Sequence, residues 1–120
     1  MNYKKAREFC ARLHGATTAT KWGSSLVFSV GDKMFAATSH DKERERGFSF
    51  KVDRERFLEL TDRPGIIPAP YLARAGWVRV TDINSLDDAE ARALLQRSYE
   101  LVFAKLTKIK QKEIGDDSHD

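Results

Sequence analysis

The chain has 120 residues, of which 41% are hydrophobic and 32% are charged, and its formal net charge is +3 at pH 7. This length suits one compact domain, and the small excess of bases lacks the polybasic bias of a nucleic-acid-binding arm. Because it has no signal-peptide pattern, no run of about 18 apolar residues and a single cysteine, Cys10, we expect a cytoplasmic protein with no membrane partner and no internal disulfide.

The first predicted element is an amphipathic helix over residues 2–14. Its apolar side chains recur at intervals of three and four residues, which places them on one helical face. Charged residues occupy the other faces, and Gly15 is of the type that commonly ends a helix. The threonines that follow are interpreted as a polar stretch. The apolar positions of the helix are Tyr3, Ala6, Cys10 and Leu13.

A β-hairpin is predicted next. Two runs of alternating apolar residues flank Gly31-Asp32, a two-residue connection that can adopt the positive backbone angles of a tight turn. We expect its strands near residues 25–30 and 33–39. Residues 40–46, HDKERER, are charged throughout and have no apolar periodicity, so they are interpreted as a solvated loop or hairpin tip.

Two further strands are predicted, and each has one wet face. The sequence GFSFKV alternates inward phenylalanines and valine with an outward serine and lysine. The sequence AGWVRVT places Val78 and Val80 on one face and Trp77 and Arg79 on the other. The first pattern indicates a third strand of the sheet, and the second indicates a last one.

A short helix and a stiff connector are predicted between these two strands. Asp53 is expected to cap the helix, which stops before Pro64 because proline cannot continue the hydrogen-bond ladder. Residues that precede prolines are pushed into extended geometry. The sequence GIIPAP is therefore predicted to be a rigid crossover that determines where Tyr71 and Arg74 lie.

A long helix, LDDAEARALLQRSYELVFAKL, is predicted to cover the sheet. Ser85, with Asp88 three residues later, resembles an acidic variant of a capping box and would open this helix. The sequence contains no internal repeat. We therefore expect a single domain over residues 1–112, followed by a frayed or disordered acidic tail over residues 113–120.

Three stretches of the chain resemble the MmcQ/YjbR family of small bacterial proteins. They are KWGSSLVFSVGDKMFA, FSFKVDRERFLELTDRPGIIPAPYLARAGWVRV and RSYELVFAKL, and the similarity spans roughly residues 3–112. The most specific part is PGIIPAPYLARAGWV, residues 64–78. Its spacings of proline, tyrosine, arginine and tryptophan are together far rarer by chance than any three-residue motif.

The resemblance implies an α+β domain in which N- and C-terminal helices pack on an antiparallel sheet, similar to the fold of secretion chaperones. It also implies DNA binding through a double-wing arrangement. Two positions depart from the family's pattern. Arg54 stands where relatives often have a proline after the aspartate, and Thr107 stands where a proline often begins the basic tail. Both departures touch charged regions that could contact a ligand.

Basic and aromatic side chains motivate the leading hypothesis, a DNA-binding protein that contacts the phosphate backbone without catalysis. Cations neutralise phosphates, and aromatic rings stack on bases. In residues 40–46, however, acidic side chains interleave with the arginines, and simple solvation is the favoured interpretation of that segment. The candidate residues are Lys21, Trp22, Lys33, Arg44, Arg46, Lys51, Arg74, Trp77 and Arg79.

Alternatives remain open for the aromatic residues and for the proline-rich segment. Trp22 and Trp77 could be packing residues, because large aromatic side chains are usually buried. The alternative function is a protein-interaction adaptor that docks a partner or peptide on the sheet or in a groove. For either function we expect a monomer that needs no cofactor. The groove would be formed by Pro68, Pro70 and Tyr71, next to Arg74.

An enzyme is the least supported class, and we predict no catalytic residue. The sequence has no glycine-rich phosphate loop, no Gly-x-Ser-x-Gly elbow and no HExxH motif. Cys10 and His14 are better explained as a buried thiol and as a histidine at the negative end of a helix. His40 and the carboxylates after it lack the spacing of a metal site, so we expect no metal. A third, weaker alternative is a small-ligand pocket near Tyr71, Arg74 and Trp77.

Overall fold

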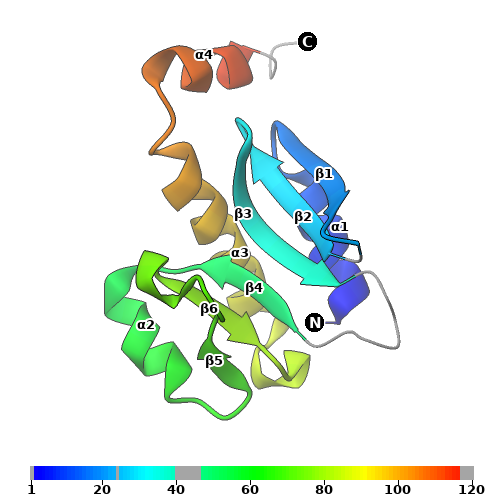
Figure 1. Cartoon of the computed structure of the whole chain (residues 1–120), viewed down its shortest axis with the longest axis vertical. Coiled ribbons are helices and arrows are strands. Elements are labelled where there is room, and N and C mark those ends of the chain that lie inside the picture. Colours follow the sequence, from blue (N-terminus) through cyan, green and yellow to red (C-terminus); the bar gives the residue numbers. More distant parts are fainter. Residues whose placement is uncertain (1, 24, 40–46, 117–120) are drawn as a thin grey trace.

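The computed structural model describes residues 2–23, 25–39 and 47–116, which form an α+β fold (Figure 1). A six-stranded antiparallel sheet in this part has the strand order β1-β2-β3-β4-β6-β5. The predicted fold class is therefore confirmed. The strands are β1 (Ala16–Lys21), β2 (Ser25–Val30), β3 (Lys33–Ser39), β4 (Phe48–Lys51), β5 (Ile66–Pro68) and β6 (Trp77–Val80). The α-helices of this part are α1 (Tyr3–Arg12), α2 (Arg54–Thr61), α3 (Asp88–Phe103) and α4 (Lys108–Asp116).

Helix α1 forms where the sequence predicts it. The side chain of Asn2 accepts a hydrogen bond from the backbone N–H of Lys5 at 2.8 Å, which satisfies one of the free N–H groups at the helix start. Ala6 and Cys10 are buried, because the apolar stripe of the helix faces the core. The helix ends before Gly15, whose φ of 74° is readily adopted only by glycine.

Strands β2 and β3 form the predicted hairpin. Gly31 and Asp32 both have positive φ angles, 56° and 67°, and such angles give a two-residue turn the twist of its flanking strands. A Cβ atom at Gly31 would lie 2.6 Å from the Leu106 side chain. The turn therefore needs glycine both for its backbone angle and for its close contact with the C-terminal region.

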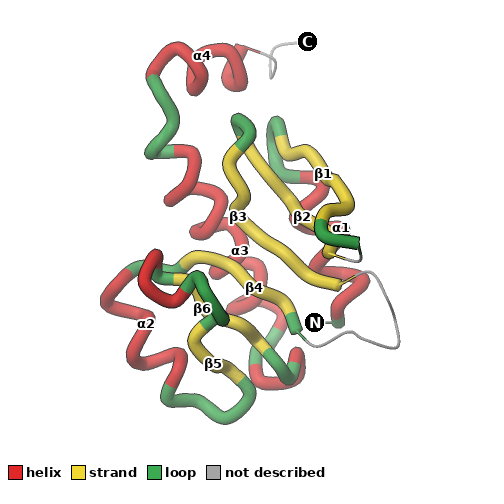
Figure 2. The backbone as a smooth tube through the Cα atoms, in the orientation of Figure 1, coloured by secondary structure: helices red, strands yellow, loops and turns green. Residues whose placement is uncertain are grey.

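Helices α1 and α3 cover one face of the sheet, and in Figure 2 both lie behind the strands. The strand residues on this face include Phe28, Phe48 and Val78, all of which are buried. The rings of Phe35 and Tyr99 meet edge to face, with centroids 5.5 Å apart, and so join β3 to α3. Removal of this apolar surface from water is the main favourable contribution to folding.

The sequence predicts neither β1 nor β5. Strand β1 is built from the threonine-rich stretch and lies at one edge of the sheet, where most of its side chains are exposed and give no apolar alternation. Strand β5 occupies part of the proline-rich connector and pairs with β6 at the other edge. Pro68 is compatible with a strand here because it is the last residue of an edge strand.

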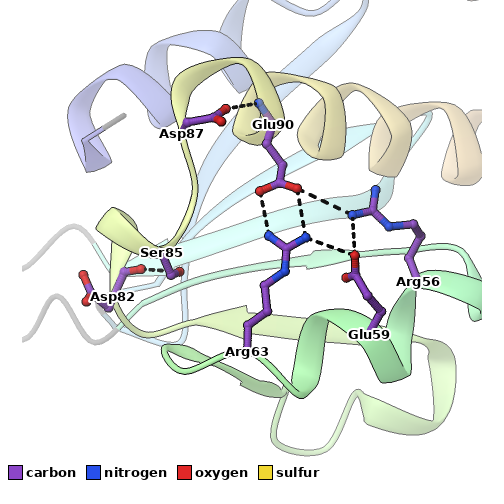
Figure 3. Close-up of polar contacts among 7 residues, drawn as sticks. All are labelled: Arg56, Glu59, Arg63, Asp82, Ser85, Asp87 and Glu90. Carbon is purple, nitrogen blue, oxygen red and sulfur yellow. Dashed lines mark hydrogen bonds and ion pairs between the residues drawn. The ribbon is translucent and has the colours of Figure 1, made fainter.

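Helix α3 begins later than the sequence predicts. Its cap is Asp87, whose carboxylate accepts a hydrogen bond from the backbone N–H of Glu90 at 2.7 Å (Figure 3). Ser85 lies in the preceding 3-10 turn, where its hydroxyl donates to the Asp82 carbonyl oxygen at 2.6 Å. The predicted capping box at Ser85 is therefore wrong, because Asp87 lies two residues later, directly before the first helical residue, and supplies the cap.

An ion-pair network joins α2 to α3 (Figure 3). The Arg63 guanidinium donates to both carboxylate oxygens of Glu90, at 2.7 and 3.1 Å, and to Glu59 at 3.0 Å. A nitrogen of Arg56 lies 3.7 Å from Glu90 and 3.4 Å from Glu59. The two parallel hydrogen bonds between the planar groups of Arg63 and Glu90 position α2 relative to α3 more specifically than a single point charge would.

The C-terminal region divides into two helices, whereas the sequence predicts one helix followed by a frayed tail. Gln111 of α4 donates hydrogen bonds to the carbonyl oxygens of Phe103 at 3.0 Å and Ala104 at 3.3 Å, and so satisfies groups at the end of α3. Ile114 is buried. Residues 113–116 therefore belong to a packed helix, which corrects the predicted tail, and residues 117–120 lie outside the described part.

Cys10 and His14 have separate structural roles. Burial raises the pKa of the Cys10 thiol to about 12, so the thiol is protonated at neutral pH. The Nε2 atom of His14 lies 2.6 Å from the Ile114 carbonyl oxygen, and the Tyr99 hydroxyl donates to the His14 carbonyl oxygen. His14 therefore connects the end of α1 to α4.

Among the helices that the structure describes, none combines the length and the apolar composition that a membrane-spanning segment requires.

Candidate functional site

A gap between β3 and β4 is the basis of the candidate site. The ladder between these strands ends at the pair Ala36 and Phe50, and the next partners along it would be Phe35 and Lys51. Instead, the Ser98 hydroxyl donates to the Phe35 carbonyl oxygen at 2.6 Å and accepts from the Lys51 N–H at 2.9 Å. One serine of α3 thus takes the place of a ladder hydrogen bond and holds the two strands apart.

Two cavities open beside this gap and meet at Lys51 and Lys105, which line both. The smaller has a volume of about 320 Å³ and lies between β3 and the β4–β6 pair, with Val102 of α3 among its lining residues. The larger, of about 670 Å³, extends toward the start of α2 and the 3-10 turn Ala73–Ala75 (η2). We call the two cavities together the basic cleft. Its cationic residues are Lys33, Lys51, Arg54, Arg74 and Lys105.

These five cations come from five separate segments: β3, β4, the start of α2, η2 and the turn after α3. Within the part of the chain that the structure describes, none of the five forms an ion pair. Two carboxylates also line the larger cavity, those of Asp53 and Glu55. The balance of charge in the basic cleft therefore depends on what those two carboxylates contact.

The Asp53 carboxylate does not neutralise the cations of the cleft, because it forms hydrogen bonds with Arg97 of α3, a residue that does not line the cleft. Two hydrogen bonds, of 2.9 and 3.0 Å, join the two groups, and these bonds lower the pKa of Asp53. Asp53 occupies the N-cap position of α2, as predicted, but its side chain makes no cap hydrogen bond, because Arg97 binds the carboxylate. Glu55 remains as an exposed carboxylate at the rim, without an ion-pair partner in the described residues.

Lys51 and Lys105 interact directly with each other. The pKa of Lys51 is lowered. Hydrogen bonding to Lys105 is the largest cause, and partial burial and repulsion from the Lys105 charge are the smaller ones. Two ammonium groups cannot hydrogen-bond to one another unless one of them gives up its proton. An anion placed between them would accept hydrogen bonds from both and would favour the charged form of each.

The structure brings together four of the nine residues predicted to bind nucleic acid. Lys33, Lys51 and Trp77 line the smaller cavity, and Arg74 lines the larger one together with Lys51. Trp77 lies on the face opposite Val78, as predicted, but it is only 5% exposed. It is therefore a packed wall of the cleft and not an exposed stacking platform, which corrects its predicted outward position.

Other candidate residues lie elsewhere. Arg79 shares a sheet face with Lys51 and Trp77 through the register of β4 and β6, and its side chain crosses toward Ser49 at 3.4 Å. Lys21 is exposed at the end of edge strand β1, and Trp22, 75% exposed, follows it. Neither lines the basic cleft. The remaining two, Arg44 and Arg46, lie outside the described residues.

The proline-rich segment lies apart from the basic cleft. Pro68, Pro70 and Tyr71 are exposed, and none of them lines either cavity of the cleft. Tyr71 has a φ of 67° and a fully exposed side chain. The segment instead supplies β5 and then η2, and η2 carries Arg74 to the rim of the cleft.

Sequence reasoning missed two cleft residues, Arg54 and Lys105. Arg54 stands out in the sequence as a departure from the family's pattern but is not assigned a role there. Lys105 follows Ser98 and Val102 at helical spacing, and both of those residues are buried. A lysine that continues the buried stripe of a helix is the signal that could have identified it.

The comparisons with known proteins agree with this fold. A family model described as YjbR matches residues 11–101. The structure is similar to the Deinococcus radiodurans protein DR2400, a DUF419 domain, at 32% identity and a TM-score of 0.82 over 93% of this chain and 86% of that one. It also resembles a protein from Pseudomonas syringae in fold, at 21% identity and a TM-score of 0.68, over 85% of this chain and 99% of that one. No curated protein matches the sequence. The family match and the 32% identity together show that the chain belongs to the YjbR family.

Proposed function

We propose that this protein is a cytoplasmic, monomeric DNA-binding protein that contacts phosphates through the basic cleft and catalyses no reaction. The observation that carries the proposal is the grouping of Lys33, Lys51, Arg54, Arg74 and Lys105 around two adjoining cavities, without ion pairs in the described residues. Because no carboxylate in the described residues pairs with these side chains, they are available to an external anion, which would also favour the charged forms of Lys51 and Lys105.

The surface next to the cleft extends the positive region. Alternation along paired strands places Lys51 and Trp77 on the same sheet face as Arg79, which is partly exposed. A DNA strand bound in the cleft could therefore continue across β4 and β6. Such contacts go to phosphates and sugars and carry little sequence information, so we expect binding with low sequence preference.

Salt dependence tests this proposal. If about four phosphates are neutralised, the logarithm of the affinity for duplex DNA should fall against the logarithm of salt concentration with a slope of about −3.6. Fluorescence anisotropy with a labelled duplex, titrated between about 50 and 200 mM salt, measures the slope. Absence of binding to duplex and single strands at the lowest salt would overturn the proposal.

Matched variants locate the binding surface. The substitutions Lys33→Ala, Lys51→Ala and Arg74→Ala should each weaken binding and make the salt slope shallower by about one unit. Lys4→Ala is the control, because Lys4 is an exposed cation on α1, which packs on the other face of the sheet. If the Lys4 variant lost as much affinity as the cleft variants, binding would depend only on net charge.

A protein-interaction adaptor is a second candidate function, and Tyr71 is the observation that favours it. A fully exposed tyrosine held at positive φ is uncommon, because non-glycine residues avoid that backbone region. Exposed tyrosines are frequent anchors at protein interfaces. The adaptor proposal predicts that Tyr71→Ala loses a protein partner captured by the wild type while its affinity for DNA stays unchanged.

A further inference from the structure

The interior of the basic cleft has the dimensions of a ligand pocket, in addition to the cationic rim that would contact a DNA backbone. Its larger cavity, of about 670 Å³, falls within the range of about 300–1,000 Å³ that is usual for small-ligand sites. A continuous duplex backbone would contact the rim of such a hollow, because its phosphates are flanked by sugars on both sides. The interior of the hollow admits a group with one free end.

The chemistry inside the cleft favours an anion that carries more than one charge. Lys51 and Lys105 both line the two cavities, and the pKa of Lys51 is lowered first by hydrogen bonding to Lys105, then by partial burial and by repulsion from the Lys105 charge. Arg54 and Arg74 line the same cavity from α2 and η2. A single negative charge would leave most of this repulsion in place, whereas a dianion would offset it more completely.

The start of α2 lines the same cavity. Arg54 and Glu55, the first two residues of the helix, both line it, and the Asp53 side chain caps neither of them because Arg97 holds it. Free N–H groups at a helix start attract negative charge. Of the two carboxylates that line this cavity, Asp53 is bound by Arg97, and Glu55 is exposed at the rim and can turn toward solvent.

A phosphomonoester meets these requirements better than a phosphodiester. At neutral pH it carries a charge of about −1.5 to −2 and has three terminal oxygens that accept hydrogen bonds. A phosphodiester carries one charge and two such oxygens. Each of these oxygens can accept more than one hydrogen bond, so three of them offer the lysine amines and the arginines of the cleft more acceptor sites than two do.

We propose that the basic cleft binds a phosphomonoester, the group found at the phosphorylated end of a nucleic-acid strand and on a mononucleotide, in preference to a phosphodiester. This inference rests on the proposed function in so far as the strand is DNA. The terminal phosphate lies between Lys51 and Lys105, and the remainder of the strand leaves the cleft along the face that carries Arg79.

Oligonucleotides that differ only at one end test the inference. Two single strands of the same sequence, one with a 5′-phosphate and one with a 5′-hydroxyl, each labelled at the 3′ end, are titrated with the protein. The phosphorylated strand should bind about tenfold tighter, which corresponds to one further hydrogen bond between charged groups. Lys105→Met should abolish the preference, and Lys4→Met should preserve it.

A second arm distinguishes the source of the phosphate. Inorganic phosphate and adenosine monophosphate are titrated separately, and shifts of the amide resonances of Lys51, Arg54 and Gly76, which line the larger cavity, are followed by NMR. Adenosine without phosphate is the control. Affinity should rise from about pH 5 to about pH 7 as the phosphate takes its second charge near pH 6.

The outcomes separate this inference from the proposed function. Salt-dependent binding of duplex DNA, with equal affinity for phosphorylated and hydroxyl ends and no shift on phosphate addition, would overturn the inference and leave the function in place. Binding of phosphate and adenosine monophosphate that depends on Lys105, with no binding of any oligonucleotide, would support the phosphomonoester site and overturn the DNA-binding function.

Discussion

The Oγ atom of Ser98 lies 2.9 Å from the backbone nitrogen of Lys51 and occupies the place of a strand carbonyl oxygen. The same hydroxyl donates to the Phe35 carbonyl oxygen at 2.6 Å, and Ser98 is fully buried. A side chain of α3 therefore completes the hydrogen bonding of β3 and β4 at the point where the two strands separate. Beside the basic cleft, the Lys51 N–H and the Phe35 carbonyl oxygen therefore keep a hydrogen-bond partner although the strands separate.

The first prediction concerns this bridge. Ser98→Ala leaves the Lys51 N–H and the Phe35 carbonyl oxygen without their partner, and the expected loss in the free energy of unfolding is about 1–3 kcal/mol. Urea denaturation followed by circular dichroism measures it. Ser85→Ala is the control, because its hydrogen bond to Asp82 lies at the exposed surface. Equal losses for the two variants would contradict the bridging role of Ser98.

The second prediction concerns the lysine pair. Because the folded state lowers the pKa of Lys51 below its ordinary value of 10.5, the unfolded chain binds this proton more tightly. The contribution is destabilising below the folded pKa, and it disappears as the pH rises through that value toward 10.5. Lys105→Met removes both the hydrogen bond and the repulsion. The stability of this variant, minus that of the wild type, should therefore be more positive near neutral pH than at alkaline pH.

Denaturation of both proteins at a series of pH values measures this difference, and other titrating groups cancel in the comparison. Lys108→Met is the control, because Lys108 is an exposed cation at the start of α4 that does not line the cleft. A difference that stays constant across the pH range for Lys105→Met would show that the two amines do not interact.

The third prediction concerns Cys10. Its pKa is raised from 9.0 to about 12 by burial, so the native thiol should not react with a thiol-specific reagent at pH 8, whereas the unfolded chain should react rapidly. Absorbance from the released chromophore, with and without urea, measures both rates. The neutral thiol contributes stability that is fully present below pH 9.0 and is lost as the pH rises toward about 12. Rapid native reaction would indicate that α1 opens readily.

The fourth prediction concerns the contact between α2 and α3. The side chains of Arg63 and Glu90 are 32% and 29% exposed, so a double-mutant cycle with Arg63→Met and Glu90→Gln should give a coupling energy of about 1 kcal/mol that decreases with salt. The more exposed pair Arg56 and Glu59 is the comparison, and a smaller coupling is expected there. Thermal or urea unfolding of the four proteins of each cycle measures the couplings. If the Arg63 and Glu90 coupling did not exceed that of the exposed pair, the network would position the helices without stabilising them.

The fifth prediction links Arg97 to the cleft that it does not line. Arg97→Met releases the Asp53 carboxylate beside the cations and should weaken DNA binding by about twofold to fivefold at low salt. The anisotropy titration described above measures this change. Asp53→Asn in the same chain removes the released charge and should restore the affinity. Failure of the second substitution to restore it would mean that Arg97 contributes to binding in another way.

Local patterns determined much of the fold. Helix α1, the hairpin of β2 and β3, and strands β4 and β6 follow from the spacing of apolar residues and from the Gly31-Asp32 turn, because periodic burial is encoded in neighbouring residues. The resemblance to the family supplied the antiparallel sheet with its packed helices. Both sources describe elements and their arrangement, and the structure confirms them.

The tertiary structure alone decided the edge strands and the cleft. Strands β1 and β5 are defined by hydrogen bonds to β2 and β6, and their exposed or proline-containing sequences carry no alternation of their own. Ser98 meets Phe35 and Lys51 across 63 and 47 residues of chain, and no local pattern indicates a serine as a bridge between strands. The same long-range packing brought Lys105 to Lys51 and turned Asp53 toward Arg97. The sequence shows which side chains are cationic. Which of them come together in the cleft depends on contacts between residues that are distant along the chain.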